Sequence, residues 1–194
     1  MPSAIPKRIS GDLPSRRTVR LAEYDYGRAG WYFVTIATHE RRPLLGRVTV
    51  DARVALSPLG QVVQRCWHEL ACRYDQLHAD CWVLMPDHVH LLLGLLPGPQ
   101  PKPLGQLIGA FKATCTRLGR PYLREELSSI WQRNNYEHII RTATELENHR
   151  HYVRDNPRRW VEKRALLRLS DNNSAGYLAN DCNDSGACDA PLLL

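Results

Sequence analysis

Residues 77–93 constrain the fold of this chain more than any other stretch of the sequence. Two apolar runs, residues 81–85 and 89–93, flank Pro86 and Asp87. Proline and aspartate favour turns, and short apolar runs on either side of a turn are typical of adjacent strands. The stretch therefore predicts a hairpin. His88 and His90 fall at the start of its second strand, separated by one residue.

The spacing of these two histidines has two interpretations. Residues i and i+2 of a strand share a face about 7 Å apart, so His88 and His90 lie side by side. Two neighbouring imidazoles can bind one divalent metal if a third ligand comes from elsewhere in the chain. The simpler alternative is a pair of polar side chains on the solvated face of a sheet. The pair alone does not decide between them.

The remaining elements complete an α+β order. A strand is predicted at 31–38, a short edge strand at 48–50, a helix from Pro58 with Ser57 as its N-cap, a helix from Leu104, and a strand near 136–140. Thr144 and Glu147 have capping-box spacing, which predicts a last helix that ends near Asn156, before Pro157. With the hairpin, this gives a ferredoxin-like βαββαβ antiparallel sheet with an additional C-terminal helix.

Charge divides the 194 residues into three parts. We expect a basic N-terminal arm at 1–23, one globular domain at 24–168 and a weakly ordered acidic tail at 169–194. The net charge is +6, but no Lys or Arg follows Arg168 while four Asp do, so residues 1–168 carry +10. A basic body favours a polyanionic partner, most commonly nucleic acid.

The sequence favours a cytoplasmic protein without a membrane partner. No apolar run approaches the ~20 residues that span a bilayer, and the N-terminus has no apolar stretch typical of a secretory signal. The six cysteines contain no C-x-x-C pair, so we expect reduced thiols rather than a structural zinc site or a disulfide framework.

The last predicted helix carries a second set of candidate residues. Tyr152 and Asn156 are four residues apart and share a helix face, and His149 lies on the same side. Each has a structural alternative: Tyr152 as a core tyrosine, Asn156 as a helix end and His149 as a surface residue.

Several stretches together resemble REP-associated tyrosine transposases, which are single-tyrosine HUH transposases. The matching residues extend from 24 to about 160, in the segments 24–26, 31–36, 82–90, 104–112, 131–141 and 152–157. Each segment alone is weak evidence for this resemblance, but the segments together form a pattern that is specific for the family.

The resemblance implies both a site and a reaction. It implies that His88, His90 and Asn156 are the ligands of a divalent metal, which is Mg²⁺, with Mn²⁺ as the alternative. It also implies that Tyr152 is the nucleophile. The implied substrate is single-stranded or hairpin DNA of the repetitive extragenic palindrome type with a flanking single-stranded tetranucleotide. The implied product is a 5′-phosphotyrosine with a free 3′-OH, which allows strands to be rejoined in DNA transposition. Monomer and dimer both stay open.

Charge and position suggest further DNA contacts. The candidates are the N-terminal arm, Lys112, Arg133, Arg141, Arg154, Arg158 and Arg159. Trp131 and Tyr136 either stack on bases or belong to the core, and His138 has no assigned role. Two other functions stay open: a domesticated hairpin-binding protein without cleavage activity, and a metal-dependent hydrolase in which Tyr152 is structural.

Overall fold

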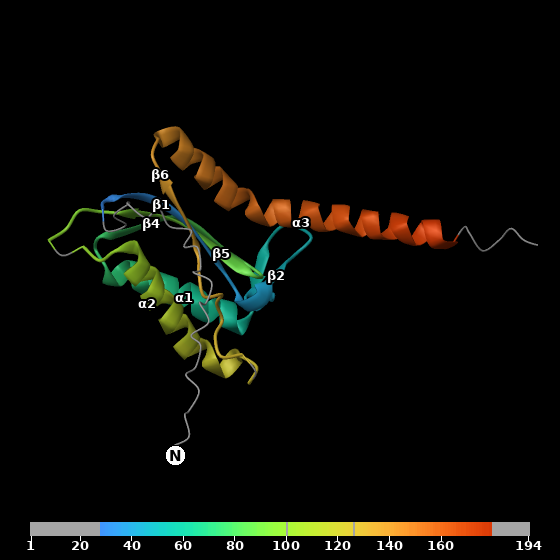
Figure 1. Cartoon of the computed structure of the whole chain (residues 1–194), viewed down its shortest axis with the longest axis horizontal. Helices are drawn as coiled ribbons and strands as arrows, with labels where there is room; N and C mark the ends of the chain where they lie inside the picture. Colours follow the sequence, from blue (N-terminus) through green and yellow to red (C-terminus); the bar gives the residue numbers. More distant parts are fainter. Residues whose placement is uncertain (1–27, 100, 126, 180–194) are drawn as a thin grey trace, which may run out of the picture.

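Four antiparallel strands form the central sheet, in the order β4-β5-β1-β6 (Figure 1). They are β1 (Gly30–Ala37), β4 (Leu77–Met85), β5 (His88–Leu95) and β6 (Tyr136–Ile140). Met85 pairs with His88, so Pro86 and Asp87 form the turn between β4 and β5. The predicted hairpin is therefore confirmed.

Two helices cover one face of the sheet and a third crosses the other (Figure 1). The first two are α1 (Pro58–Arg73) and α2 (Leu104–Gly119), and the third is α3 (Ala143–Ala179). The element order and the strand order confirm the predicted ferredoxin-like α+β fold with an additional C-terminal helix.

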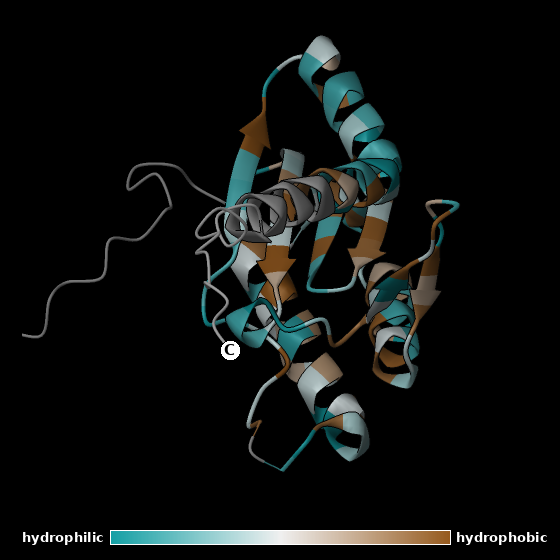
Figure 2. Ribbon diagram, turned by 90° about the vertical axis from the view of Figure 1, so that its right-hand side faces the viewer, coloured by the Kyte–Doolittle hydropathy of each residue, from teal (hydrophilic) through white to brown (hydrophobic). Residues whose placement is uncertain are grey.

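The computed structural model describes residues 28–99, 101–125 and 127–179, with side chains described as far as residue 167. The predicted basic arm, the matching segment 24–26 and residues 180–194 of the predicted tail lie outside the described residues. Within those ranges, no helix is both long and apolar enough to cross a membrane. The longest helix, α3, is largely hydrophilic in its first half (Figure 2).

Between β1 and α1 the chain forms a small separate ribbon. It consists of β2 (Gly46–Val48) and β3 (Val54–Leu56), and it follows the 3-10 turn η1 (His39–Arg41); a second such turn, η2 (Arg120–Tyr122), follows α2. The short strand predicted at 48–50 is displaced by two residues, because β2 ends at Val48 and pairs with β3 rather than with an edge of the main sheet. The chain turns at Thr49, whose backbone N–H donates to Arg53, and Val50 is 96% exposed.

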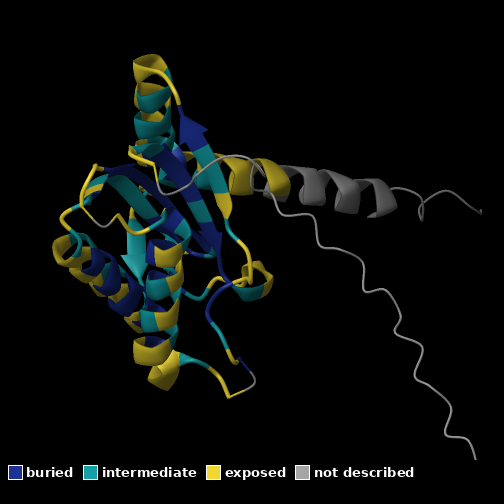
Figure 3. Ribbon diagram, turned by 60° about the vertical axis from the view of Figure 1, so that its left-hand side comes forward, coloured by how far each residue is buried: buried dark blue, intermediate teal, exposed yellow. Residues whose placement is uncertain are grey.

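The hydrophobic core lies between the sheet and the pair α1 and α2. Side chains alternate across β1, so Tyr32, Val34 and Ile36 all point into this core and are fully buried. The apolar stripes of α1 and α2 pack against them, including Trp67 and Phe111. Figure 3 shows the buried residues concentrated along the strands and the inner sides of these helices.

Capping side chains fix where the helices begin. The Ser57 hydroxyl accepts a hydrogen bond from the Gly60 N–H at 3.0 Å, which confirms the predicted N-cap of α1. At α3 the predicted capping box is displaced by two residues. Thr142 accepts from the Glu145 N–H at 3.1 Å, and the Glu145 carboxylate accepts from the Arg141 N–H at 2.8 Å. A threonine precedes a glutamate by three residues at 142 and 145 as well as at 144 and 147, and the structure uses the first pair. Glu145 of that pair also bonds to His138 on β6.

The predicted end of α3 near Asn156 is wrong, because the helix continues through Pro157 to Ala179. A proline removes one backbone hydrogen bond and crowds the carbonyl four residues earlier, which bends a helix without always ending it. Figure 1 shows α3 changing direction part-way along its length. Ion pairs from Asp155 to Arg158 and Arg159 span the proline, and a further pair from Arg158 to Glu162 follows it.

Candidate active site

His88 and His90 lie together on the sheet face that α3 crosses. Their side chains are almost fully enclosed, with 7% and 5% of each residue exposed. The two Nε2 atoms are 3.0 Å apart. Two donor atoms held about 2.1 Å from one ion at neighbouring octahedral positions are about 3.0 Å apart, so this separation fits shared coordination.

Each imidazole is oriented through its other nitrogen. His88 Nδ1–H donates to the Asp87 carboxylate at 2.5 Å, and a 2.8 Å hydrogen bond joins His90 Nδ1 to the Thr35 hydroxyl. An imidazole that donates from Nδ1 keeps the lone pair of Nε2 for a ligand. Both rings therefore present Nε2 to the same point.

Charge and burial favour the neutral imidazole of His90. Burial, with the nearby charges of His88 and Arg41, lowers the pKa of His90 to about 3. Burial alone would raise the pKa of Asp87, but its hydrogen bond to His88 and the charges of His88 and Arg41 lower it below its usual value. The site thus contains a neutral imidazole next to an ionised carboxylate at neutral pH.

Helix α3 brings Tyr152 and Asn156 to the two histidines. The rings of Tyr152 and His90 meet edge to face, with centroids 5.2 Å apart. Val153, fully buried against Phe33, packs this turn of the helix onto the sheet, and Asn156 is only 7% exposed. The four predicted residues of the metal and nucleophile site therefore come together within one chain.

These residues line one open pocket of about 520 Å³. Its wall consists of Thr35, Arg41, Asp87, His88, His90, Tyr152, Asn156, Arg159, Trp160 and Lys163. Among the described residues, no group of three or more His, Cys, Asp or Glu side chains is suited to hold a metal ion. A metal at this site would consequently need the Asn156 amide oxygen and water beside the two imidazoles.

Three cations make the pocket suited to an anion. Arg41 lies 3.8 Å from the Asp87 carboxylate, and the Arg159 guanidinium lies 5.4 Å from the centre of the Tyr152 ring. Lys163 completes the set. The buried indole N–H of Trp160 has no hydrogen-bond partner within the described part of the chain. A phosphate group offers acceptors to the three cations.

Sequence reasoning missed most of this cationic rim. Arg159 was among the predicted DNA contacts, but Lys163, one turn further along the helical face that starts at Tyr152, was missed. Extending the predicted helix past Pro157 would have found it. Arg41 gives no such signal, because it sits in a 3-10 turn with a left-handed backbone (φ 55°). A non-glycine residue in that conformation costs about 1–3 kcal/mol, and such strain is concentrated at functional sites.

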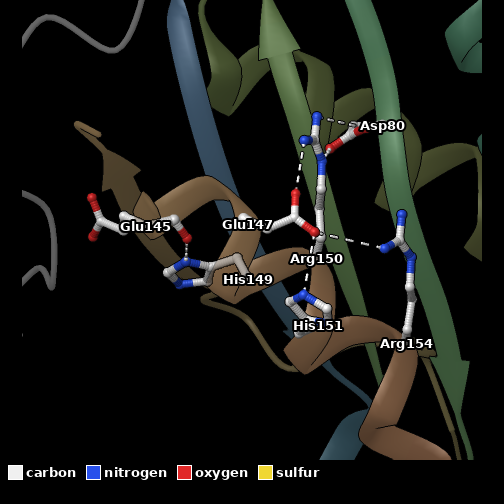
Figure 4. Close-up of polar contacts among 7 residues, drawn as sticks. All are labelled: Asp80, Glu145, Glu147, His149, Arg150, His151 and Arg154. Atoms are coloured by element: carbon white, nitrogen blue, oxygen red, sulfur yellow. Dashed lines mark hydrogen bonds and ion pairs between the residues drawn. The ribbon is translucent and has the colours of Figure 1, made fainter. Parts of the chain in front are cut away.

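A polar anchor sets α3 on the sheet (Figure 4). Arg150 donates from Nε to the Asp80 carboxylate on β4 at 2.7 Å, and its second hydrogen bond to the same carboxylate is 3.3 Å long. Glu147 bonds to Arg150 from one turn earlier and also pairs with His151 and Arg154. Arg150 lies six residues before Asn156, so this network ties α3 to β4 less than two turns before the pocket.

The predicted DNA contacts mostly lie outside this pocket. Lys112 on α2 donates to the backbone carbonyls of Gln132 and Arg133 at 2.7 and 3.0 Å, so it joins a loop to a helix on the far face of the sheet. Burial lowers its pKa. The side chains of Arg133 and Arg141 are exposed. Arg154 and Arg158 line a separate shallow pocket on α3 that they share with Arg159.

The two aromatic candidates have different environments. Trp131 is buried in the main core, whereas Tyr136 on β6 is 49% exposed. His138 bonds to the Glu145 carboxylate at 2.5 Å and stacks on His149, with ring centroids 5.3 Å apart. His149 in turn contacts Phe33, so it is neither a surface residue nor part of the pocket at His88.

Comparisons with known proteins were made by family, by sequence and by structure. No family model matches the chain. An uncharacterised protein of Haemophilus influenzae is 29% identical over 174 residues, covering 80% of this chain and 95% of that protein. A second protein of the same organism, named "Putative REP-associated tyrosine transposase", is 25% identical over 140 residues, covering 69% of this chain and 73% of its own.

The structural comparison agrees in fold. A REP-associated tyrosine transposase solved bound to a REP hairpin matches 74% of this chain and 73% of its own, with a TM-score of 0.54 and 20% sequence identity. A crystal structure from Deinococcus radiodurans, named "a putative transposase", matches 69% of this chain and 95% of its own, with a TM-score of 0.46 and 19% identity. The comparisons confirm the resemblance of this chain to REP-associated tyrosine transposases.

Proposed function

We propose that this protein cleaves and rejoins single-stranded hairpin DNA through a covalent bond to Tyr152, as a step of DNA transposition. One observation carries the proposal: β5 and α3 bring His88, His90, Tyr152 and Asn156 to one pocket, although more than 60 residues separate the histidines from Tyr152 in the sequence. The names of the similar proteins, which refer to REP-associated tyrosine transposases and a REP hairpin, support hairpin DNA as the substrate.

The rim of the pocket would hold the DNA backbone. Arg41, Arg159 and Lys163 supply positive charge around the histidines. Phosphate contacts of this kind fix the position of a strand without reading its sequence. The open pocket suits a single strand, because a duplex would hold the phosphate away from the sheet face.

His88, His90 and Asn156 would hold a divalent cation, Mg²⁺ or Mn²⁺. The fit rests on the two Nε2 atoms 3.0 Å apart and on the Nδ1 bonds to Asp87 and Thr35 that orient them. When bound, the cation would polarise the non-bridging oxygens of the phosphate and stabilise the charge that develops in the reaction.

Tyr152 would supply the nucleophile. Its phenolic oxygen forms a bond to phosphorus, the bond from phosphorus to the 3′ oxygen breaks, and the phenol proton is lost while the departing oxygen takes up a proton. The products are a 5′-phosphotyrosine and a free 3′-OH. Attack by a 3′-OH on the phosphotyrosine reverses the step and joins two strands, and no water is consumed.

A covalent-trapping experiment tests this proposal. Wild type, Tyr152→Phe and Tyr136→Phe are incubated with Mg²⁺ and an end-labelled single-stranded hairpin library with randomised flanks, then separated on denaturing gels. We expect a shifted protein–DNA band in wild type and Tyr136→Phe and none in Tyr152→Phe. Cleavage without any shifted band would favour a hydrolase, and binding without cleavage in wild type would favour a domesticated hairpin-binding protein.

A further inference from the structure

A second cavity opens on the other side of Tyr152. It measures about 290 Å³ and is lined by Phe33, Tyr136, Asn148, His149 and Tyr152, and we name it the aromatic slot. Four of these five side chains are aromatic rings. Tyr152 also lines the pocket that contains His88 and His90, so its ring forms a wall of both cavities.

Strand register places the slot close to the histidines. On the face that α3 crosses, His90 pairs with Thr35 on β1, and Thr35 pairs with Tyr136 on β6. Neighbouring strands are about 4.8 Å apart, so Tyr136 lies two strands, roughly 10 Å, from His90. A strand of DNA with a phosphate at the histidines therefore has a neighbouring nucleotide within reach of the slot.

The walls of the slot are rigid on one side and open on the other. Phe33 and His149 meet with ring centroids 4.8 Å apart, and His149 is backed by His138, which Glu145 holds in place. Tyr136 stands opposite on the edge strand β6, with 49% of the residue exposed. An exposed tyrosine facing fixed rings leaves a space between aromatic surfaces.

The rim adds one polar group. Asn148 is exposed on α3, and its carboxamide makes no hydrogen bond to any of the residues that the structure describes. A carboxamide presents both a donor and an acceptor, which matches the edge of a nucleobase. Bases without a pairing partner are commonly bound by stacking on aromatic side chains with polar contacts at their edges.

We propose that the aromatic slot binds one unpaired nucleobase of a nucleotide next to the phosphate attacked by Tyr152. This proposal rests on the proposed function, because it takes the DNA strand in the neighbouring pocket as given. Tyr136 supplies the exposed stacking surface, and the Phe33–His149 wall supplies its fixed counterpart. The slot would keep the strand in register with the nucleophile by holding a base, while the cationic rim holds the backbone.

The test compares strands with and without bases. Fluorescence anisotropy measures the affinity of the full chain for 12-nucleotide oligothymidylate and oligoadenylate and for an abasic strand of the same length. Stacking of one base contributes about 1–3 kcal/mol, which is a factor of about 5 to 150 in affinity. We expect Tyr136→Ala to reduce the preference for base-bearing strands by that factor, and Tyr136→Phe, which keeps the ring, to retain it.

An exposed tyrosine elsewhere provides the matched control. Tyr122 on η2 is 55% exposed and lies outside the slot, so Tyr122→Ala should leave the preference unchanged. Circular dichroism checks that each variant is folded. The proposal that the slot binds a base would be overturned if wild type and folded Tyr136→Ala had equal preferences for base-bearing over abasic strands. It would also be overturned if wild type had no such preference.

The slot and the proposed function can fail separately. Tyr152→Phe keeps the shared ring, so it should retain the base preference while losing the covalent adduct. An adduct in wild type together with an unchanged preference in Tyr136→Ala would reject the slot and leave the proposed function intact. A base preference that depends on Tyr136 in a protein that forms no adduct would support the slot and reject the cleavage chemistry.

Discussion

The two faces of the central sheet are built from the same strands but serve different purposes. Along β5, Val89, Leu91 and Leu93 point toward α1 and α2 and are fully buried in the main core. The alternate residues His88 and His90 point toward α3 and form the candidate site. Because side chains alternate along a strand, one strand can stabilise the fold with one face and bind a substrate with the other.

The face under α3 has little apolar packing of its own. Its cluster of buried residues contains only Phe33, Leu92, Ile140 and Val153 among the residues described. The Arg150–Asp80 contacts supplement this packing, and open pockets lie on both sides of Tyr152. A helix held by a small apolar cluster and polar anchors leaves space for a ligand, and the core on the opposite face supplies the stability that such a site lacks.

The largest expected effect comes from removing an imidazole. We expect His88→Ala and His90→Ala each to abolish strand cleavage in Mg²⁺ while hairpin binding is largely retained, because the phosphate contacts come from other residues. Gel assays of cleavage and electrophoretic mobility shifts measure the two properties on the same DNA. Full cleavage by the double variant would remove the metal site from the proposed mechanism.

The neighbouring position on the same strand should respond in the opposite way. Leu91→Ala removes a fully buried side chain from the main core, and substitutions of this kind cost about 2–5 kcal/mol of unfolding free energy. Urea denaturation of Leu91→Ala and His90→Ala gives the comparison directly. A larger loss of unfolding free energy in His90→Ala than in Leu91→Ala would contradict the assignment of stability to the face under α1 and α2.

Two cations on opposite faces provide a finer comparison. Lys112→Ala removes two hydrogen bonds to backbone carbonyls and should lower the unfolding free energy by about 1–3 kcal/mol, with the salt dependence of DNA binding unchanged. Arg159→Ala removes a proposed phosphate contact and should reduce the slope of log affinity against log salt by about 1. Titrations between low and physiological salt measure the slopes, and a change of slope in Lys112→Ala alone would reverse the assignment.

The sequence predicted the elements that local pattern determines. Two apolar runs on either side of the turn at Pro86 and Asp87 identified the hairpin, and the resemblance pointed to Asn156 as the partner of Tyr152. Strand alternation and helix periodicity act over a few residues, so they can be read from one sequence. They also placed His88 and His90 on one face, which the structure confirms.

Features that depend on tertiary context were missed. The helix α3 continues through Pro157, although the residue before a proline usually avoids helical geometry. Because the predicted helix ended too early, the sequence also missed Lys163 in the pocket. Lys112 was assigned to DNA by its charge, but a loop distant in sequence occupies its amine. Arg41 reaches the site through a left-handed turn that residue preferences disfavour.

The most direct test of the central claim is to identify the tyrosine that becomes linked to DNA. After trapping with Mg²⁺ and the single-stranded hairpin library, the adduct is digested with nuclease and trypsin and analysed by mass spectrometry. Cleavage after Arg150 and Arg154 yields the peptide 151–154, which contains Tyr152, whereas Tyr136 falls in the peptide 134–141. In wild type we predict that peptide 151–154 carries a nucleotide linked through its phosphate to the tyrosine. In His88→Ala we predict no modified peptide. A phosphonucleotide on peptide 134–141, or on no tyrosine despite cleavage of the DNA, would contradict the assignment of Tyr152 as the nucleophile.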